Sequence, residues 1–185
     1  MQRSAGSHLK KVFAISIFIF LFGLFSGLFF SIGMSEGAKD DLSSSFISSI
    51  TDESIGHARI LLSSLFSNYM ISALMLTAAL SNILCFLPFT VLWCRSFAIG
   101  FCSGLIHISG TESPVVLSLT ELLPPSMFFI PGFILLAAAS YVCSRNEILK
   151  SKRPSSTGKS LISLILISLA VVTAGCIVET ICHLL

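Results

Sequence analysis

The sequence predicts an all-α protein, a polytopic membrane bundle of about five transmembrane helices in which one helix is broken by prolines. Its composition is the first reason, because 54% of the 185 residues are hydrophobic, 11% are charged and the mean hydropathy is +0.94. Water-soluble domains do not have this composition. The second reason is that no Asp, Glu, Lys or Arg occurs at residues 12–34 or between Arg59 and Arg95. We therefore expect one membrane domain over residues 1–185.

The first apolar stretch predicts a crossing over residues 12–34 with the N-terminus in the cytoplasm. Arg3, Lys10 and Lys11 precede it, and basic residues mark the cytoplasmic flank of a transmembrane helix. The stretch is too long for the apolar region of a signal peptide, so we expect an uncleaved anchor. Gly23 and Gly27 have the G-x-x-x-G spacing that lets two helices approach closely, although this spacing also arises by coincidence in glycine-rich helices.

Residues 35–59 are predicted to form an exterior loop. Acidic residues outnumber basic ones in it, and basic residues favour the cytoplasmic side. The acidic residues are Glu36, Asp40, Asp41, Asp52 and Glu53, and the basic ones are Lys39 and Arg59.

The uncharged run at residues 60–94 is too long for one crossing, since a helix of that length would rise about 52 Å through a core of about 30 Å. We expect an interfacial segment, then crossings over residues 68–86 and 89–109, separated by a turn at Pro88. Arg95 would either extend to the cytoplasmic face or pair within the bundle. Gly100 and Gly104 would form a narrow stripe for close packing.

Residues 114–143 are predicted to form a broken helix followed by the fourth crossing. Pro124 and Pro125 remove two backbone donors and disfavour helical geometry before them. We therefore expect a half-helix up to residue 123, a crossing from residue 126, and a kink at Pro131. Such a break is tolerated in a membrane only where protein or water surrounds it.

A basic connection over residues 144–160 is predicted to lie in the cytoplasm. The last crossing, over residues 161–181, would then leave the C-terminus outside. The basic residues of the connection, opposed by Glu147 alone, are Arg145, Lys150, Lys152, Arg153 and Lys159.

Three ionisable residues are candidates for a site at the outer level. Glu121 is a carboxylate within an apolar segment, and it would either cap the broken helix near the interface or serve a function there. Glu179 and His183 lie one helical turn apart. The candidate site residues, for structure or interaction, are Glu121, Pro124, Pro125, Pro131, Arg95, Gly100, Gly104, Glu179 and His183.

No metal, cofactor or catalytic residue is predicted. The acidic, histidine and cysteine residues at the outer level come from separate segments and lack an H-E-x-x-H anchor for zinc. The chain has no G-x-S-x-G motif and no P-loop, so we expect no enzyme. It also lacks a basic surface with interleaved aromatic residues, so we expect no nucleic-acid partner.

Three segments resemble the stage II sporulation protein M family of bacterial membrane proteins. They are "FGLFSGLFFS" (22–31), "RSFAIGFCSGLI" (95–106) and "LSLTELLPPSMFFIPGF" (117–133). The resemblance covers nearly the whole chain. Many wider members of the family have a His-Gly pair before the glutamate, where this chain has Leu117 and Ser118, and this difference favours the sporulation branch.

The resemblance implies a non-enzymatic membrane scaffold that acts in engulfment, in the mother-cell membrane at the septum and then around the forespore. Its implied partners are the peptidoglycan-degrading stage II sporulation proteins D and P, and the lipid bilayer is its solvent. The alternative is a small-solute or ion permease that uses the broken helix around Glu121. Against it, five crossings do not divide into inverted halves. The sequence leaves open whether the chain forms a homo-oligomer.

Overall fold

The computed structural model describes residues 2–35, 37–38, 41–42, 45, 57–80, 83–108, 123–145 and 156–182. These residues form five long α-helices and contain no strand, so the all-α prediction is confirmed for them. The helices are α1 (Gln2–Gly33), α3 (His57–Thr77), α4 (Leu87–Ile108), α6 (Leu123–Arg145) and α7 (Ser156–Cys182), and a 3-10 turn, η1 (Ala78–Leu80), continues α3.

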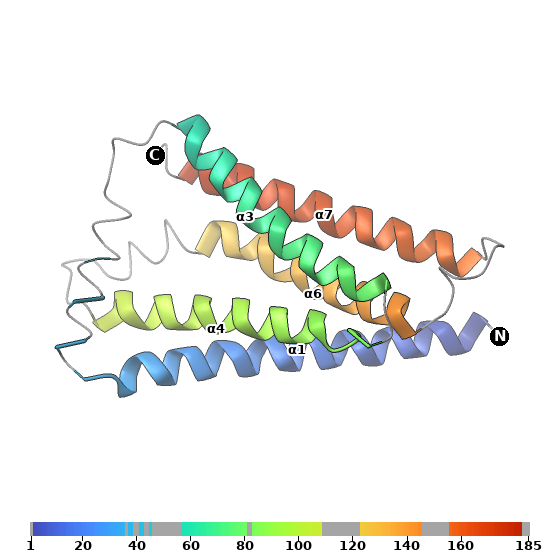
Figure 1. Cartoon of the computed structure of the whole chain (residues 1–185), viewed down its shortest axis with the longest axis horizontal. Coiled ribbons are helices and arrows are strands. Elements are labelled where there is room, and N and C mark those ends of the chain that lie inside the picture. Colours follow the sequence, from blue (N-terminus) through green and yellow to red (C-terminus); the bar gives the residue numbers. More distant parts are fainter. Residues whose placement is uncertain are drawn as a thin grey trace.

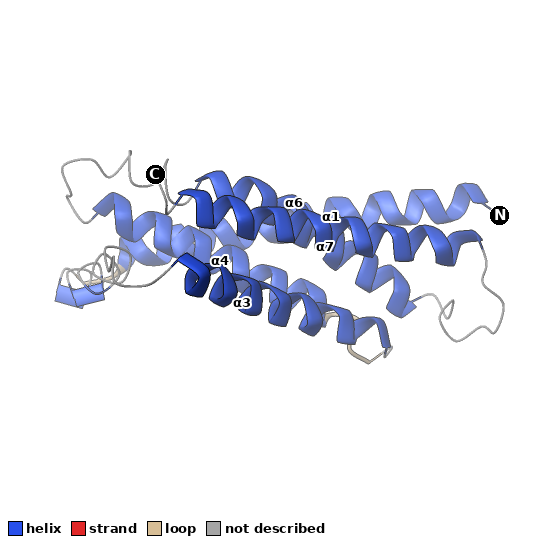
Figure 2. Cartoon of the chain, turned by 90° about the horizontal axis from the view of Figure 1, so that it is seen from above, coloured by secondary structure: helices blue, strands red, loops and turns tan. Residues whose placement is uncertain are grey.

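The five helices lie along the long axis of the bundle (Figure 1), and Figure 2 shows the same arrangement from above. Helices α1, α4 and α7 run in one direction, and α3 and α6 run in the opposite direction. The start of α1, the end of α6 and the start of α7 therefore lie at one end, which we call the N-terminal end. The starts of α3 and α6 lie at the other end with the close of α7, and we call this the C-terminal end.

Helices α1 and α4 pack closely through two pairs of glycines. A Cβ atom at Gly27 would lie 2.1 Å from the carbonyl oxygen of Phe97, and one at Gly100 would lie 2.1 Å from that of Leu24. Backbone atoms thus occupy the space that a side chain would need. The glycine spacing indicates close packing, and the structure shows that the two pairs meet in one parallel interface.

The core lies where α3, α4, α6 and α7 meet. The side chains of these four helices that have no exposed surface include Met75, Leu92, Leu136, Val172 and Cys176. Helix α6 is central, since it contacts each of the other four helices and its face at Leu136, Ala137, Ala138 and Ala139 is buried. These contacts stabilise the bundle by van der Waals packing, because lipid is as apolar as the core.

Small polar side chains are buried between the helices, while many large apolar ones face outward. Among the side chains whose burial the structure describes, the buried polar ones are all serines apart from Asn68. Ser16 donates a hydrogen bond to the carbonyl oxygen of Val12 at 3.0 Å, and Ser168 donates one to that of Ile165 at 2.8 Å. A serine that bonds within its own helix occupies little space, so a neighbouring helix can pack against it.

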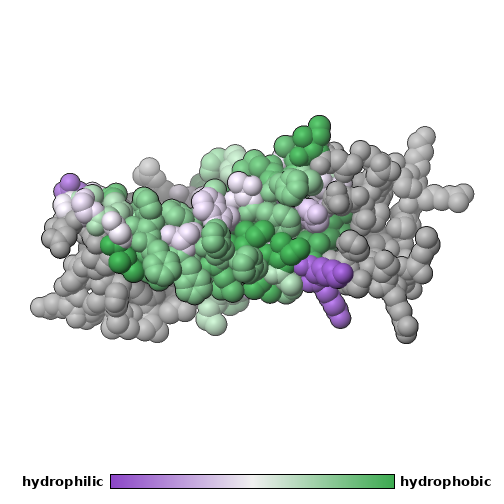
Figure 3. Space-filling view, turned by 90° about the horizontal axis from the view of Figure 1, so that it is seen from below, coloured by the Kyte–Doolittle hydropathy of each residue, from purple (hydrophilic) through white to green (hydrophobic). Residues whose placement is uncertain are grey.

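The outer surface of the described residues is largely apolar along the middle of the bundle. Figure 3 shows green hydrophobic spheres there and purple hydrophilic ones toward the ends. On α1, Phe18, Phe22 and Phe29 are each at least 60% exposed. An exposed apolar surface of this extent is expected for a chain surrounded by lipid.

Three helical stretches among the described residues are long and apolar enough to cross a membrane. They are Leu9–Gly33, Ser126–Ser144 and Leu161–Ile181. Together with the all-helical fold and the apolar surface, they indicate a helical membrane protein. The five crossings and their orientation remain predictions.

The helix boundaries differ from the predicted crossings most clearly in the second one. We expected a crossing over residues 68–86 after an interfacial segment, but α3 begins at His57 and ends at Thr77. The chain turns at residues 83–86, where the backbone N–H of Leu87 donates to the carbonyl oxygen of Leu84 at 2.9 Å. Pro88 then occupies the first turn of α4, where a missing backbone donor costs nothing. The run is therefore divided nearer its middle than we predicted.

The other helices extend past their predicted crossings by at most one or two turns, except α1. Helix α1 starts at Gln2, about three turns before residue 12. Helices α4, α6 and α7 correspond to the crossings expected over residues 89–109, 126–143 and 161–181. Helix α1 ends at Gly33 and α3 begins at His57, so the loop expected at residues 35–59 lies largely outside the described residues. The same is true of the loop expected at residues 144–160, between α6 and α7.

The prolines of the predicted break lie in the first turn of α6. This helix begins at Leu123, so Pro124 and Pro125 need no intrahelical donor. The half-helix predicted before them lies outside the described residues, and the break remains a prediction. Pro131 is inside α6, which is continuous past it to Arg145.

Candidate functional site

The candidate site is a group of polar side chains that extends from the middle of the bundle toward its C-terminal end, and we call it the polar cluster. It consists of Ser64 and Asn68 of α3, Arg95 of α4, and Cys176 and Glu179 of α7. Arg95 is the only Asp, Glu, Lys or Arg residue in α4. Asn68 lies near the middle of α3 and is only 3% exposed. An ionisable side chain at this depth in a membrane helix needs partners, and such a residue commonly marks a functional site.

Arg95 points into the bundle, which decides between the two orientations that the sequence left open. Its Nη2 donates a hydrogen bond to Oδ1 of Asn68 at 3.1 Å. Its guanidinium carbon also lies 5.9 Å and 5.8 Å from the ring centroids of Phe129 and Phe133 of α6. Aromatic faces attract a cation most strongly where water is absent. Arg95 therefore connects α4 with both α3 and α6.

The amide of Asn68 continues the connection toward α7. Its Nδ2 donates to the backbone carbonyl oxygen of Ser64 at 2.9 Å and lies 3.3 Å from Oγ of the same residue. Nδ2 also lies 3.6 Å from Sγ of Cys176, whose side chain is fully buried. Both polar ends of the Asn68 amide are thereby satisfied without water.

The hydroxyl of Ser64 donates a hydrogen bond to the carboxylate oxygen Oε2 of Glu179. This bond completes a chain of hydrogen bonds from Arg95 through Asn68 and Ser64 to α7. The carboxylate is also close enough to attract the guanidinium electrostatically. Each interhelical hydrogen bond in a membrane contributes about 0.6–2 kcal/mol. A second link between α3 and α7 is made by the hydroxyls of Tyr69 and Thr173, 2.7 Å apart. The polar cluster thus connects four helices, with its carboxylate near the C-terminal end.

One donor in the polar cluster lacks a partner. Nε of Arg95 is buried and makes no hydrogen bond with any described residue. A buried donor left unpaired costs about 1–3 kcal/mol. The arrangement can therefore hold a charge within the bundle, and the guanidinium can donate one more hydrogen bond through Nε.

The structure brings together some of the predicted site residues and not others. Arg95 and Glu179 belong to the polar cluster, whereas Gly100 and Gly104 line the α1 and α4 interface on another side of α4. Pro131 has an exposed side chain within α6. Glu121 and His183 lie outside the described residues, and of Pro124 and Pro125 only the helical backbone is described.

Sequence reasoning missed Ser64, Asn68 and Cys176 as members of this site. The available signal was an asparagine within an uncharged membrane run, because a carboxamide in lipid needs partners as an ion does. Among the described residues, no group of three or more His, Cys, Asp or Glu side chains could hold a metal ion.

Comparison with known proteins identifies one relationship. No curated protein and no solved structure matches the chain. The family described as Stage II sporulation protein M matches residues 16–182, from the first turns of the apolar part of α1 to the last residue of α7. Because the match covers nearly all of the sequence and includes part or all of every described helix, the chain belongs to the stage II sporulation protein M family.

Proposed function

We propose that the chain is a multi-pass scaffold in the membrane of a sporulating cell that holds peptidoglycan-degrading partners at the septal and engulfing membrane. It carries out no catalysis itself. The family match over residues 16–182 carries this proposal. The partners proposed are stage II sporulation proteins D and P, and the proposed orientation has the N-terminus inside and the C-terminus outside.

The alternating direction of the helices supports this orientation. Lys10 and Lys11 lie near the N-terminal end, where α6 also ends and α7 begins. The chain between those two helices carries an excess of basic residues, and basic segments favour the cytoplasmic side. The opposite end would then face outward, together with the acidic residues that follow α1 in the sequence.

The internal links of the bundle support a scaffold, because a scaffold must present a fixed surface. Helix α1 packs on α4 through backbone contacts at the glycines, and the polar cluster connects α4 with α3, α6 and α7. These contacts hold each helix in a fixed position relative to the helices that it packs against. Partners that bind at the C-terminal end would meet helix ends held in constant relative positions.

Recovery of the partners from sporulating cells tests the proposal. Pro124 and Pro125 begin α6 at the C-terminal end and are expected to position Glu121 and the segment before it. Replacing both by alanine should reduce co-purification of proteins D and P while the amount of chain in the membrane is unchanged. Pro131→Ala is the matched control, since this residue lies inside α6, and it should leave partner recovery unchanged. Full recovery with the double variant would refute this role of the prolines, and failure of the unmodified chain to recover either partner would refute the scaffold.

The polar cluster favours one second candidate, a small-solute or ion permease. Polar side chains that extend from one end of a membrane bundle to its middle resemble the sites of transporters. Flux in reconstituted vesicles that is lost in both Glu121→Gln and Arg95→Gln would support this function. Absence of flux for a panel of small ions and amino acids, with partner recovery intact, would favour the scaffold.

A further inference from the structure

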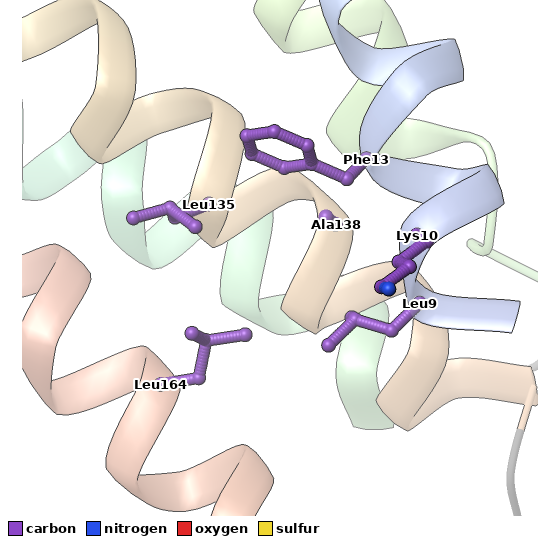
Figure 4. Close-up of a pocket in the computed structure, with 6 residues that line it drawn as sticks. All are labelled: Leu9, Lys10, Phe13, Leu135, Ala138 and Leu164. Atoms are coloured by element: carbon purple, nitrogen blue, oxygen red, sulfur yellow. The ribbon is translucent and has the colours of Figure 1, made fainter. Parts of the chain in front are cut away.

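A small apolar cavity lies between three helices near the N-terminal end of the bundle. Its volume is about 200 Å³ and it is partly open to the surroundings. Figure 4 shows its lining, in which the side chains come from α1, α6 and α7. The lining residues are Leu9, Lys10, Phe13, Leu135, Ala138 and Leu164.

The cavity can hold a hydrocarbon chain and cannot hold a helix. All the lining side chains except Lys10 end in carbon atoms, so apart from Lys10 no side chain of the wall would hydrogen-bond to a polar guest. A helix with its side chains is about 10–12 Å across, far more than this space admits. A flexible acyl chain fits, because it is thin and gains van der Waals contacts on all three helices.

A positive charge lies at the rim of the cavity. Leu9 is the first residue of the apolar stretch of α1, so Lys10 lies where that stretch begins. Its side chain is exposed and belongs to the lining, and Lys11 beside it is exposed but does not line the cavity. A lysine at this level can keep its methylene stem on apolar surface and its ammonium group among lipid headgroups.

We propose that this cavity binds one acyl chain of an anionic phospholipid of the cytoplasmic leaflet, with the negatively charged headgroup on the ammonium group of Lys10. The apolar wall selects the chain, and the lysine selects the charge of the headgroup. Basic sites between membrane helices on the cytoplasmic side recognise anionic lipids in this manner. The inference rests on the orientation proposed above and does not depend on the sporulation partners.

Fluorescence quenching by brominated lipid tests the inference at the cavity itself. Trp93 is the only tryptophan of the chain, so Trp93→Phe removes the background and Phe13→Trp then reports from the cavity wall. The full chain is reconstituted in vesicles of phosphatidylcholine with a varied fraction of phosphatidylglycerol, and one of the two lipids is brominated. Half-maximal quenching should need about three- to fivefold less brominated phosphatidylglycerol than brominated phosphatidylcholine, the factor that one lysine near a charged lipid surface contributes.

Two charge variants and one control position show whether the lipid preference comes from Lys10 and from the cavity. Lys10→Gln should bring the lipid preference close to one, whereas Lys11→Gln should retain it. A reporter at the exposed Phe22, away from the cavity, should show no preference. Equal quenching by both lipids at Phe13→Trp, a preference that persists in Lys10→Gln, or the same preference at Phe22→Trp would each overturn the inference. If Phe13→Trp does not fold, Leu9→Trp reports from the same wall with the same expected outcomes.

Discussion

Replacing Gly100 by alanine should destabilise the bundle, because the added methyl group would collide with the backbone of α1. The new Cβ would lie 2.1 Å from the carbonyl oxygen of Leu24, 2.9 Å from its carbonyl carbon and 3.1 Å from its Cα. Close contacts between helices place carbon and oxygen about 3.3–3.6 Å apart. The two helices must therefore separate by roughly 1.2 Å at this point.

The expected cost is about 1–3 kcal/mol, the usual range for an extra methyl group in a closely packed site. Alanine also favours helix over glycine by about 1 kcal/mol, which acts in the opposite direction. Gly33→Ala provides the matched control, because a Cβ at Gly33 of α1 would meet no atom within 4 Å. Gly100→Ala should thus be less stable than Gly33→Ala by about 1–3 kcal/mol.

Reversible unfolding in mixed detergent micelles, followed by circular dichroism, measures this difference. The membrane content of each variant is recorded in parallel, so that failed insertion is distinguished from lower stability. Equal stability of the two alanine variants would show that α1 and α4 are not in backbone contact at Gly100. The parallel glycine interface would then be wrong.

Four further outcomes are expected. Asn68→Ala should lower the free energy of unfolding by about 1–3 kcal/mol because it leaves Arg95 and Cys176 without their amide partner; no change in the same assay would argue against the polar cluster. Glu179→Gln should cost less than Glu179→Ala, since glutamine keeps an oxygen for the hydroxyl of Ser64, and the reverse order would exclude that bond. Gly175→Ala should be milder than Gly100→Ala, because its Cβ would meet the ring of Phe129 at 2.7 Å and a ring can shift more easily than backbone; a larger loss would contradict this. Alkaline phosphatase fused after the last residue of the chain should be active and one fused within residues 150–153 should be inactive, and the opposite result would invert the proposed orientation.

Arg95 shows how much of the site could be predicted from the sequence. A single basic residue in an apolar helix predicts that the charge needs either the cytoplasmic face or a partner. The choice depends on Asn68, which is 27 positions earlier in the chain, and on two phenylalanines of α6. No local pattern links these positions, so the polar cluster could not be assembled from spacing.

The helix ends show a similar limit. The lengths of the apolar stretches predicted where most of the long helices lie. The uncharged run at residues 60–94, however, contains no charged residue that would mark the turn between its two helices. The structure divides it at residues 83–86, just before Pro88. Lipid tolerates any apolar residue at a given depth, so composition alone does not say where such a run turns.

The sequence by itself determined that this protein is helical and apolar on the outside. The uncharged runs at residues 12–34 and 60–94 are long, and in lipid such runs satisfy their backbone hydrogen bonds as helices. It also indicated that small residues at Gly23, Gly27, Gly100 and Gly104 permit close approach. Only the tertiary structure decided that these glycines face one another in parallel helices, and that Arg95 and Glu179 share one polar cluster. The physical reason is that partner choice among apolar helices depends on the matching of shape and hydrogen bonds between segments distant in the chain.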